Sequence, residues 1–197
     1  MSFLITYSGH MPYSTSNLKA HYGYDEKKVF KNSLEEQLYC IKYQAKMTDD
    51  MFKGLLENLK KDKLLDDTVI VVFTDHYAYG FTETDYIKAQ KGVNEEVLLQ
   101  KTPLIIWSND IKHKDIDTVM DTADLVPTIA NLFGLKYDPS KYLSTDVFSK
   151  EHDKFVYFNN GTYVDNEDNI HQNTDEINEF IKFNKNILKT DYYAKNK

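Results

Sequence analysis

The chain has 197 residues, 41% of them hydrophobic, so it is long enough to bury a core and is not generally disordered. Its 24 basic and 31 acidic residues give a net charge of −7, which argues against nucleic acid as a partner. Every basic residue is lysine, so phosphate recognition would lack the guanidinium fork and depend on lysine, backbone amides or a metal ion.

Cysteine content and hydropathy bear on the compartment of the chain. Cys40 is the only cysteine, so no intrachain disulfide can form. No stretch reaches the roughly 18 apolar residues of a membrane span, and the first residues lack the basic region of a signal peptide. We therefore expect a soluble chain that folds as one unit. Its start on a strand-like segment resembles the start of an excised fragment.

The first third of the sequence predicts a strand, a loop and a long helix. Phe3–Tyr7 is rich in β-branched and aromatic residues, and the following Ser8–Tyr13 carries glycine and proline, which favour a loop. Ser33 with Glu36 fits a capping box at the start of the helix. Apolar or small residues then recur at the period of one helix face, at Leu34, Leu38, Ile41, Ala45, Thr48, Phe52, Leu55 and Leu59.

The middle of the sequence alternates strands and helices, which indicates an α/β fold. Val69–Phe73 is an unbroken apolar run with four β-branched residues, typical of a central parallel strand covered on both faces. Thr102–Trp107 predicts a second such strand. Asp124–Phe133 predicts a helix, with Pro127 in its first turn and Gly134 as its stop.

The C-terminal part predicts a small hairpin and a last helix. Phe155–Phe158 and Thr162–Val164 flank Asn159–Gly161, an Asn-Gly turn of the hairpin type. Ile177–Leu188 has the pattern of a terminal helix, and the stretch Asp165–Glu179 is acidic and rich in asparagine.

Asp75 and His76 are the strongest candidates for chemistry, because they follow directly on the Val69–Phe73 strand. Ligands in open α/β sheets collect beyond the carboxyl ends of strands. Adjacent side chains on a regular strand point to opposite faces, so these two can share an ion only if the backbone turns there. A carboxylate with an imidazole suits a borderline divalent ion such as Mn²⁺ or Zn²⁺. Alternatively, Asp75 caps a short turn and His76 is its hydrogen-bonded partner.

His10 lies in the loop after the first predicted strand. If that strand neighbours Val69–Phe73, His10 faces the same crevice as Asp75, where an imidazole could act as acid or base. The alternative is a polar surface residue without a catalytic role.

The ordered set of motifs resembles the lipoteichoic acid synthase and sulfatase branch of the alkaline phosphatase superfamily. The similarity covers about residues 3–165, so Asp165–Lys197, the terminal helix and tail, lie largely beyond it. The motifs that carry it are Ser8–Tyr13, Asp66–Ile70, Asp75-His76, Thr102–Ile106, Asp124–Ile129 with Leu132 and Gly134, Asp146–Ser149, and Asn160–Tyr163.

The resemblance implies an alkaline phosphatase-like α/β/α sandwich with a mostly parallel sheet, truncated at its N-terminal side, and a small C-terminal hairpin region. Residues 1–197 would then be the C-terminal portion of a catalytic domain. It further implies that Asp75 and His76 are metal ligands and that His10 lies at the substrate phosphoglycerol group. The family's acidic ligand and its threonine nucleophile have no counterpart in this chain. Ser144-Thr145 stands where the family has Gly-Arg, which puts any substrate contact there in doubt.

The implied function is that of a metal-dependent phosphoglycerol transferase that acts on glycerophospholipid or polyglycerol-phosphate in the synthesis of a cell-surface polymer. The parent protein would be membrane-anchored at the extracellular face of a bacterial cell. The metal would be Mn²⁺, with Mg²⁺ or Zn²⁺ as alternatives, bound weakly because only two ligands are present. The missing N-terminal half of the domain would be a partner. Two other functions fit the sequence: a sulfatase or phosphomonoesterase of the same superfamily, and a catalytically inactive interaction domain.

Overall fold

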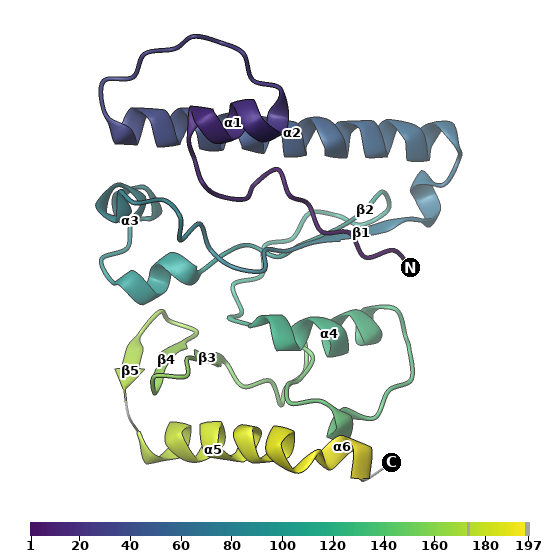
Figure 1. Cartoon of the computed structure of the whole chain (residues 1–197). Helices are drawn as coiled ribbons and strands as arrows, with labels where there is room; N and C mark the ends of the chain where they lie inside the picture. The colour runs from purple at the N-terminus through teal and green to yellow at the C-terminus, as the bar shows by residue number, and fades with distance from the viewer. Residues whose placement is uncertain (173, 196–197) are drawn as a thin grey trace. The chain divides into compact units, whose positions relative to one another are not determined.

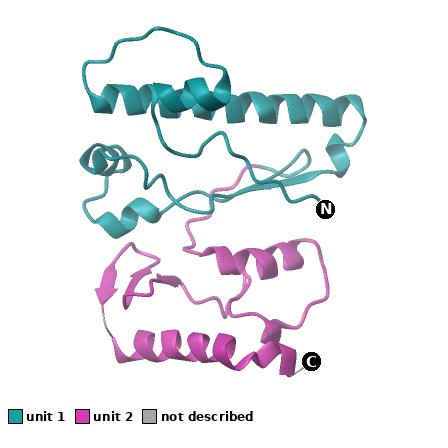
Figure 2. Cartoon of the chain, viewed as in Figure 1, with its two compact units in different colours: residues 1–112 teal, residues 113–197 magenta. Residues whose placement is uncertain are grey.

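A computed structural model describes residues 1–172 and 174–195 and divides the chain into two compact units, Met1–Lys112 and His113–Lys197 (Figure 2). The sequence predicts one folded unit, because its length and hydrophobic content suit one domain with a core. Each unit nevertheless has its own helices, its own sheet and its own buried residues. Among the described residues, no helix is both long enough and apolar enough to cross a membrane.

The first unit combines a long helix with a two-stranded sheet (Figure 1). The short helix α1 lies against α2, and the sheet pairs β1 with β2. Its elements in chain order are α1 (Thr15–Tyr22), α2 (Ser33–Lys61), η1 (Leu65–Asp67), β1 (Val69–Val72), α3 (Thr84–Lys91), η2 (Glu96–Gln100) and β2 (Ile105–Ser108).

Helix α2 confirms the predicted long helix, but its cap lies one residue earlier than the sequence suggests. The side chain of Asn32 accepts a hydrogen bond from the backbone N–H of Glu35 at 2.9 Å, and the Glu35 carboxylate accepts from Lys31 N at 2.8 Å. Glu36, the predicted capping residue, instead accepts from both the backbone N–H and the hydroxyl of Thr15, at 2.9 and 2.8 Å. A side chain at the first turn of α2 therefore caps α1 as well, because both helix starts expose unpaired N–H groups.

The buried core of the first unit lies between α1, α2 and the segment after β1. Leu18 and Cys40 are fully buried, and the rings of Tyr13 and Phe81 lie with their centroids 6.4 Å apart. Burial raises the pKa of the Cys40 thiol to about 11, so this side chain stays protonated at neutral pH. The core thus joins the loop of His10 to the loop that follows Asp75 and His76.

The sheet of the first unit is antiparallel, which corrects the predicted central parallel strand. Val72 pairs with Ile105 and Val69 with Ser108, so the connection from β1 to β2 leaves and returns at the same end of the sheet. The apolar run was expected to be covered on both faces. No residue of β1 is buried, and Val69 and Ile105 are exposed. A mostly parallel sheet is not found among the described residues, since the second sheet is also antiparallel.

The predicted strand at Phe3–Tyr7 does not form. The side chains of Phe3, Leu4 and Ile5 are 72%, 75% and 83% exposed, and no strand pairs with this segment. β-Branched and aromatic residues favour a strand only when a neighbouring strand supplies the hydrogen bonds and a surface to pack on. The intrinsic preference of this segment is therefore not realised in the first unit.

The second unit places helices α4 and α5 with a three-stranded antiparallel sheet (Figure 1). The predicted hairpin is confirmed, with Gly161 at φ 85° in its turn, a backbone conformation that favours glycine. Strand β5 was not predicted. The elements are η3 (Thr122–Asp124), α4 (Leu125–Leu132), η4 (Pro139–Lys141), β3 (Phe155–Tyr157), β4 (Thr162–Asp165), β5 (Ile170–Gln172), α5 (Asp175–Thr190) and α6 (Tyr192–Lys195).

Helix α4 is held to the loop before β3 by a buried hydrogen bond. The Thr128 side chain is fully buried, and its hydroxyl accepts from the backbone N–H of Val147 at 3.0 Å. One turn later, the Asn131 amide donates to the Asp146 carboxylate at 2.7 Å. The predicted helix motif with proline and threonine thus has a structural role, because Thr128 satisfies a buried backbone N–H and Asn131 a carboxylate of the same loop.

We predict that Thr128→Val lowers the free energy of unfolding by about 1–3 kcal/mol, because it preserves the shape of the side chain but leaves the buried Val147 N–H without an acceptor. Chemical denaturation followed by circular dichroism measures the loss. Thr128→Ser keeps the hydroxyl and should be less destabilising. An equal loss in both variants would show that the hydrogen bond contributes little.

Candidate metal and acid–base site

Asp75 and His76 lie where β1 ends and β2 begins. The backbone bends at these two residues, which follow shortly after the last residue of β1. Such a bend is what allows the two adjacent side chains to face the same ion. The Thr74 hydroxyl donates to the Thr102 hydroxyl at 2.7 Å and ties this bend to the segment that leads into β2. Because β1 and β2 are antiparallel, the loop that follows β1 and the loop that precedes β2 lie together at one end of the sheet.

The side chains of Asp75 and His76 face one another across a short gap. Asp75 Oδ1 lies 3.6 Å from His76 Nε2, and the two side chains are 81% and 40% exposed. The other ring nitrogen, Nδ1, lies 2.8 Å from the carbonyl oxygen of Tyr77. A carbonyl only accepts, so Nδ1 carries a proton, and in the neutral ring Nε2 presents its lone pair toward Asp75.

This pair fits a divalent cation in geometry and in donor chemistry. Two ligand atoms 3.6 Å apart can each lie at ~2.0–2.2 Å from one ion, with an angle of about 120° at that ion. The hydrogen bond from His76 Nδ1 to a backbone carbonyl is the outer contact that metal-binding histidines commonly make. Within the described part of the chain, no set of three or more His, Cys, Asp or Glu side chains could hold a metal ion. The pair alone therefore supports only weak binding.

His10 lies beside this pair. Its ring centroid is 6.5 Å from that of His76, with the two rings nearly perpendicular, and its ring stacks on Tyr7 at 5.3 Å. His10 Nδ1 contacts the carbonyl of Met11 at 2.6 Å, so this histidine also carries its proton on Nδ1 and leaves Nε2 free. The structure thus brings together the three residues singled out in the sequence, although Phe3–Tyr7 is not a strand.

Tight packing holds the His10 loop against the loop after His76. A Cβ atom at Gly80 would lie 2.6 Å from Met11 Cβ and would overlap the Met11 sulfur, so only glycine permits this approach. Below the loop, the buried Tyr13 hydroxyl donates to Gly9 O at 3.4 Å, and burial raises the pKa of Tyr13. That hydroxyl therefore remains a donor at neutral pH.

Aromatic residues that sequence reasoning missed surround the candidate site. Tyr79 packs on His76 with ring centroids 4.6 Å apart, and Tyr7 also approaches His21 at 6.4 Å. The Tyr22 hydroxyl fixes the Tyr7 carbonyl at 3.1 Å. The high tyrosine content, 15 of 197 residues, was the available signal, but tyrosine gives no period or spacing that would assign it to a site.

A buried histidine and carboxylate in the second unit form a structural network. Asp124 accepts from the backbone N–H of Asp121 at 2.9 Å and of Thr145 at 3.3 Å, and burial raises its pKa. His152 lies between the Thr145 hydroxyl, 3.1 Å from Nδ1, and the Val119 carbonyl, 2.9 Å from Nε2. These contacts satisfy loop backbone groups, and both side chains are almost fully enclosed. Neither is accessible to a substrate.

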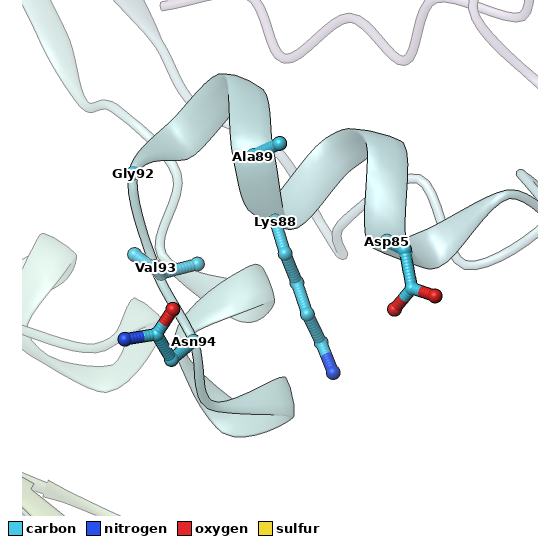
Figure 3. A pocket seen from close by; sticks show the side chains of 6 residues that line it. All are labelled: Asp85, Lys88, Ala89, Gly92, Val93 and Asn94. Atoms are coloured by element: carbon cyan, nitrogen blue, oxygen red, sulfur yellow. The ribbon is translucent and has the colours of Figure 1, made fainter.

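A shallow hollow elsewhere in the first unit does not resemble a phosphate site. It lies along α3 and the residues after it, and Figure 3 shows the Lys88 and Asp85 side chains at its opening. The backbone N–H groups of Gly92 and Val93 bond to helix carbonyls at the C-terminal end of α3, where the helix dipole repels anions. None of the predicted site residues lines it.

The sequence is similar to a known family and to characterised bacterial proteins. A sequence model of the sulfatase family matches residues 1–135, which include His10, Asp75 and His76. Lipoteichoic acid synthase 2 of Bacillus subtilis is 30% identical over 127 residues, which cover 61% of this chain and 19% of that protein. Lipoteichoic acid synthase of Staphylococcus saprophyticus is 27% identical over 173 residues, or 82% of this chain and 25% of that protein. The chain spans about a fifth to a quarter of the length of these relatives.

We predict that Gly80→Ala lowers the free energy of unfolding by about 1–3 kcal/mol, because the added methyl group forces the Met11 loop away. Gly54→Ala is the matched control. A Cβ at this α2 position meets nothing within 4 Å, so alanine should raise stability by about 0.5–1 kcal/mol. Thermal unfolding of both variants measures the difference, and a neutral Gly80→Ala would contradict the tight approach of the two loops.

Proposed function

This chain belongs to the sulfatase family, and we propose that it forms part of a metal-dependent phosphoglycerol transferase of the lipoteichoic acid synthase type. The observation that carries the proposal is the arrangement of Asp75, His76 and His10 at one end of the β1–β2 sheet. The similarity to several lipoteichoic acid synthases favours a phosphodiester over a sulfate ester as substrate.

In this proposal Asp75 and His76 hold a divalent cation, with Mn²⁺ preferred over Mg²⁺ or Zn²⁺. The mixed oxygen and nitrogen donors suit a borderline ion. When bound, such an ion lowers the pKa of a hydroxyl nucleophile and neutralises charge on phosphoryl oxygens. The role of His76 Nδ1–H is to fix the ring through the Tyr77 carbonyl, so that Nε2 keeps its direction.

His10 acts on the leaving group. Attack of a hydroxyl on the phosphorus of a glycerophospholipid headgroup breaks the bond to the diacylglycerol oxygen, and that oxygen needs a proton as it departs. Imidazole gives and takes protons near neutral pH, and His10 Nε2 is the ring nitrogen without an internal partner. His10 therefore serves as the general acid when its ring carries a second proton on Nε2: that proton passes to the departing alkoxide, and the ring returns to the neutral Nδ1–H form.

The nucleophile and a further acidic ligand come from outside residues 1–197 in this proposal. Asp75 and His76 leave most of a coordination shell open, and the matched parts of these lipoteichoic acid synthases are only 19% and 25% of their length. We place the complete protein at the extracellular face of a bacterial membrane, where glycerophospholipid and polyglycerol-phosphate would be its substrates.

We predict Mn²⁺-dependent release of glycerol phosphate from a phosphatidylglycerol analogue by a polypeptide in which residues 1–197 follow the upstream half of the domain. His10→Ala and Asp75→Asn should each lower turnover by ~10²-fold or more, because such residues act as a unit. Asp115→Asn is the control, since Asp115 also pairs with a histidine, His113, at 3.0 Å but lies in the second unit.

Residues 1–197 alone should show no turnover, because general acid assistance cannot replace a nucleophile. Efficient cleavage of an aryl sulfate or an aryl phosphomonoester, with no release of glycerol phosphate, would favour the sulfatase or phosphomonoesterase alternative. Absence of any turnover and of any Mn²⁺ binding in the longer polypeptide would favour an interaction domain.

A further inference from the structure

We propose that Gln44 is a positioning residue that sets the direction in which His10 presents Nε2. Its amide Nε2 donates to the backbone carbonyl of His10 at 2.9 Å, across 34 residues of sequence. Gln44 is completely buried in α2, whereas His10 is exposed. The acid–base role of His10 comes from the proposed function, whereas the effect of Gln44 on the direction of its ring does not depend on that function.

The hydrogen bond acts on the ring of His10 through the backbone. The carbonyl that Gln44 holds belongs to the peptide bond between His10 and Met11, so this bond anchors the peptide plane that leads into Met11 and restrains where the Met11 carbonyl can lie. The Met11 carbonyl is the acceptor for His10 Nδ1–H at 2.6 Å. One buried amide therefore determines which ring nitrogen carries the proton and which remains free.

Two further contacts reinforce this arrangement. The Ser8 and Thr48 hydroxyls are 2.7 Å apart, and Thr48 also donates to the carbonyl of Gln44 at 3.4 Å, so the loop is attached to α2 at two neighbouring turns. Tyr7 stacks on the ring of His10 with an angle of 8° between the planes. The stack limits rotation of the ring once its backbone is fixed.

The side chain of Gln44 is poorly explained by packing alone. Its Oε1 is buried and has no hydrogen-bond partner among the described residues. An unpaired buried acceptor is unfavourable, and methionine would fill the same space without that cost. A purely structural position would therefore suit methionine better. The donor to His10 is the feature that methionine lacks.

Gln37, two turns earlier on α2, provides a matched comparison. Its amide is fully used: Nε2 donates to the hydroxyls of Ser33 and Thr82, both at 2.7 Å, and Oε1 accepts from Thr82 N at 2.9 Å. None of these hydrogen bonds involves His10, and they stabilise a different loop. Replacing each glutamine by methionine therefore separates general destabilisation from a specific effect on His10.

The test measures the tautomer of His10 in the ¹⁵N-labelled chain by long-range ¹H–¹⁵N correlation, at a pH where the ring is neutral and without metal. The wild-type ring should be in the Nδ1–H form. Gln44→Met should leave the melting temperature unchanged or raised, and should shift His10 to a mixture of both tautomers. Gln37→Met should lower the melting temperature and leave the His10 tautomer as in the wild type.

A Gln44→Met chain that keeps the wild-type Nδ1–H form would overturn the proposal. If that variant does not fold, hydrogen exchange of the Gln44 side-chain amide in the wild-type chain replaces it as the test. One of the two amide protons should be protected from exchange with solvent, and rapid exchange of both would overturn the inference. Addition of Mn²⁺ separates this result from the proposed function. Failure of Mn²⁺ to broaden the His76 signals would contradict the metal site and leave the tautomer result standing.

Discussion

Two glutamines on one helix fix both loops of the candidate site. Gln44 binds the His10 carbonyl, and Gln37 binds Thr82 after the Asp75–His76 bend. They are seven residues apart, so they lie on the same face of α2 about 10 Å apart along its axis. The close contact of Met11 with Gly80 then joins the two loops directly. If α2 moved relative to the sheet, both loops would move with it and the spacing of the three site residues would change.

The elements with strong periodicity could be predicted from the sequence, and the pairing of strands could not. Helix α2, helix α4 and the hairpin at Gly161 follow from local signals: a 3.6-residue period, a proline in the first turn and an Asn-Gly turn. The antiparallel pairing of Val72 with Ile105 depends on the path of the connection, which composition does not reveal. Phe3–Tyr7 has strand propensity but no pairing partner, and propensity alone does not bury it.

The site was predictable to the level of residue type and loop, but not to the level of atoms. Asp75, His76 and His10 were identified because polar residues follow apolar segments and resemble a family motif. Which nitrogen of each histidine faces the site depends on the carbonyls of Tyr77 and Met11, which are known only from coordinates. Gln44 was hidden for a similar reason: a glutamine on a long helix is usually solvent-exposed, and only the fold shows it buried under His10. The metal itself and the catalytic roles stay predictions.

The most direct test of the account is anomalous diffraction at the manganese edge from crystals of this chain soaked in Mn²⁺. The account predicts a peak ~2.0–2.2 Å from both Asp75 Oδ1 and His76 Nε2. It further predicts that this peak disappears in Asp75→Asn, while any weak peak at the His113–Asp115 pair persists. A manganese peak that avoids Asp75 and His76, or one that survives Asp75→Asn unchanged, would contradict the central claim.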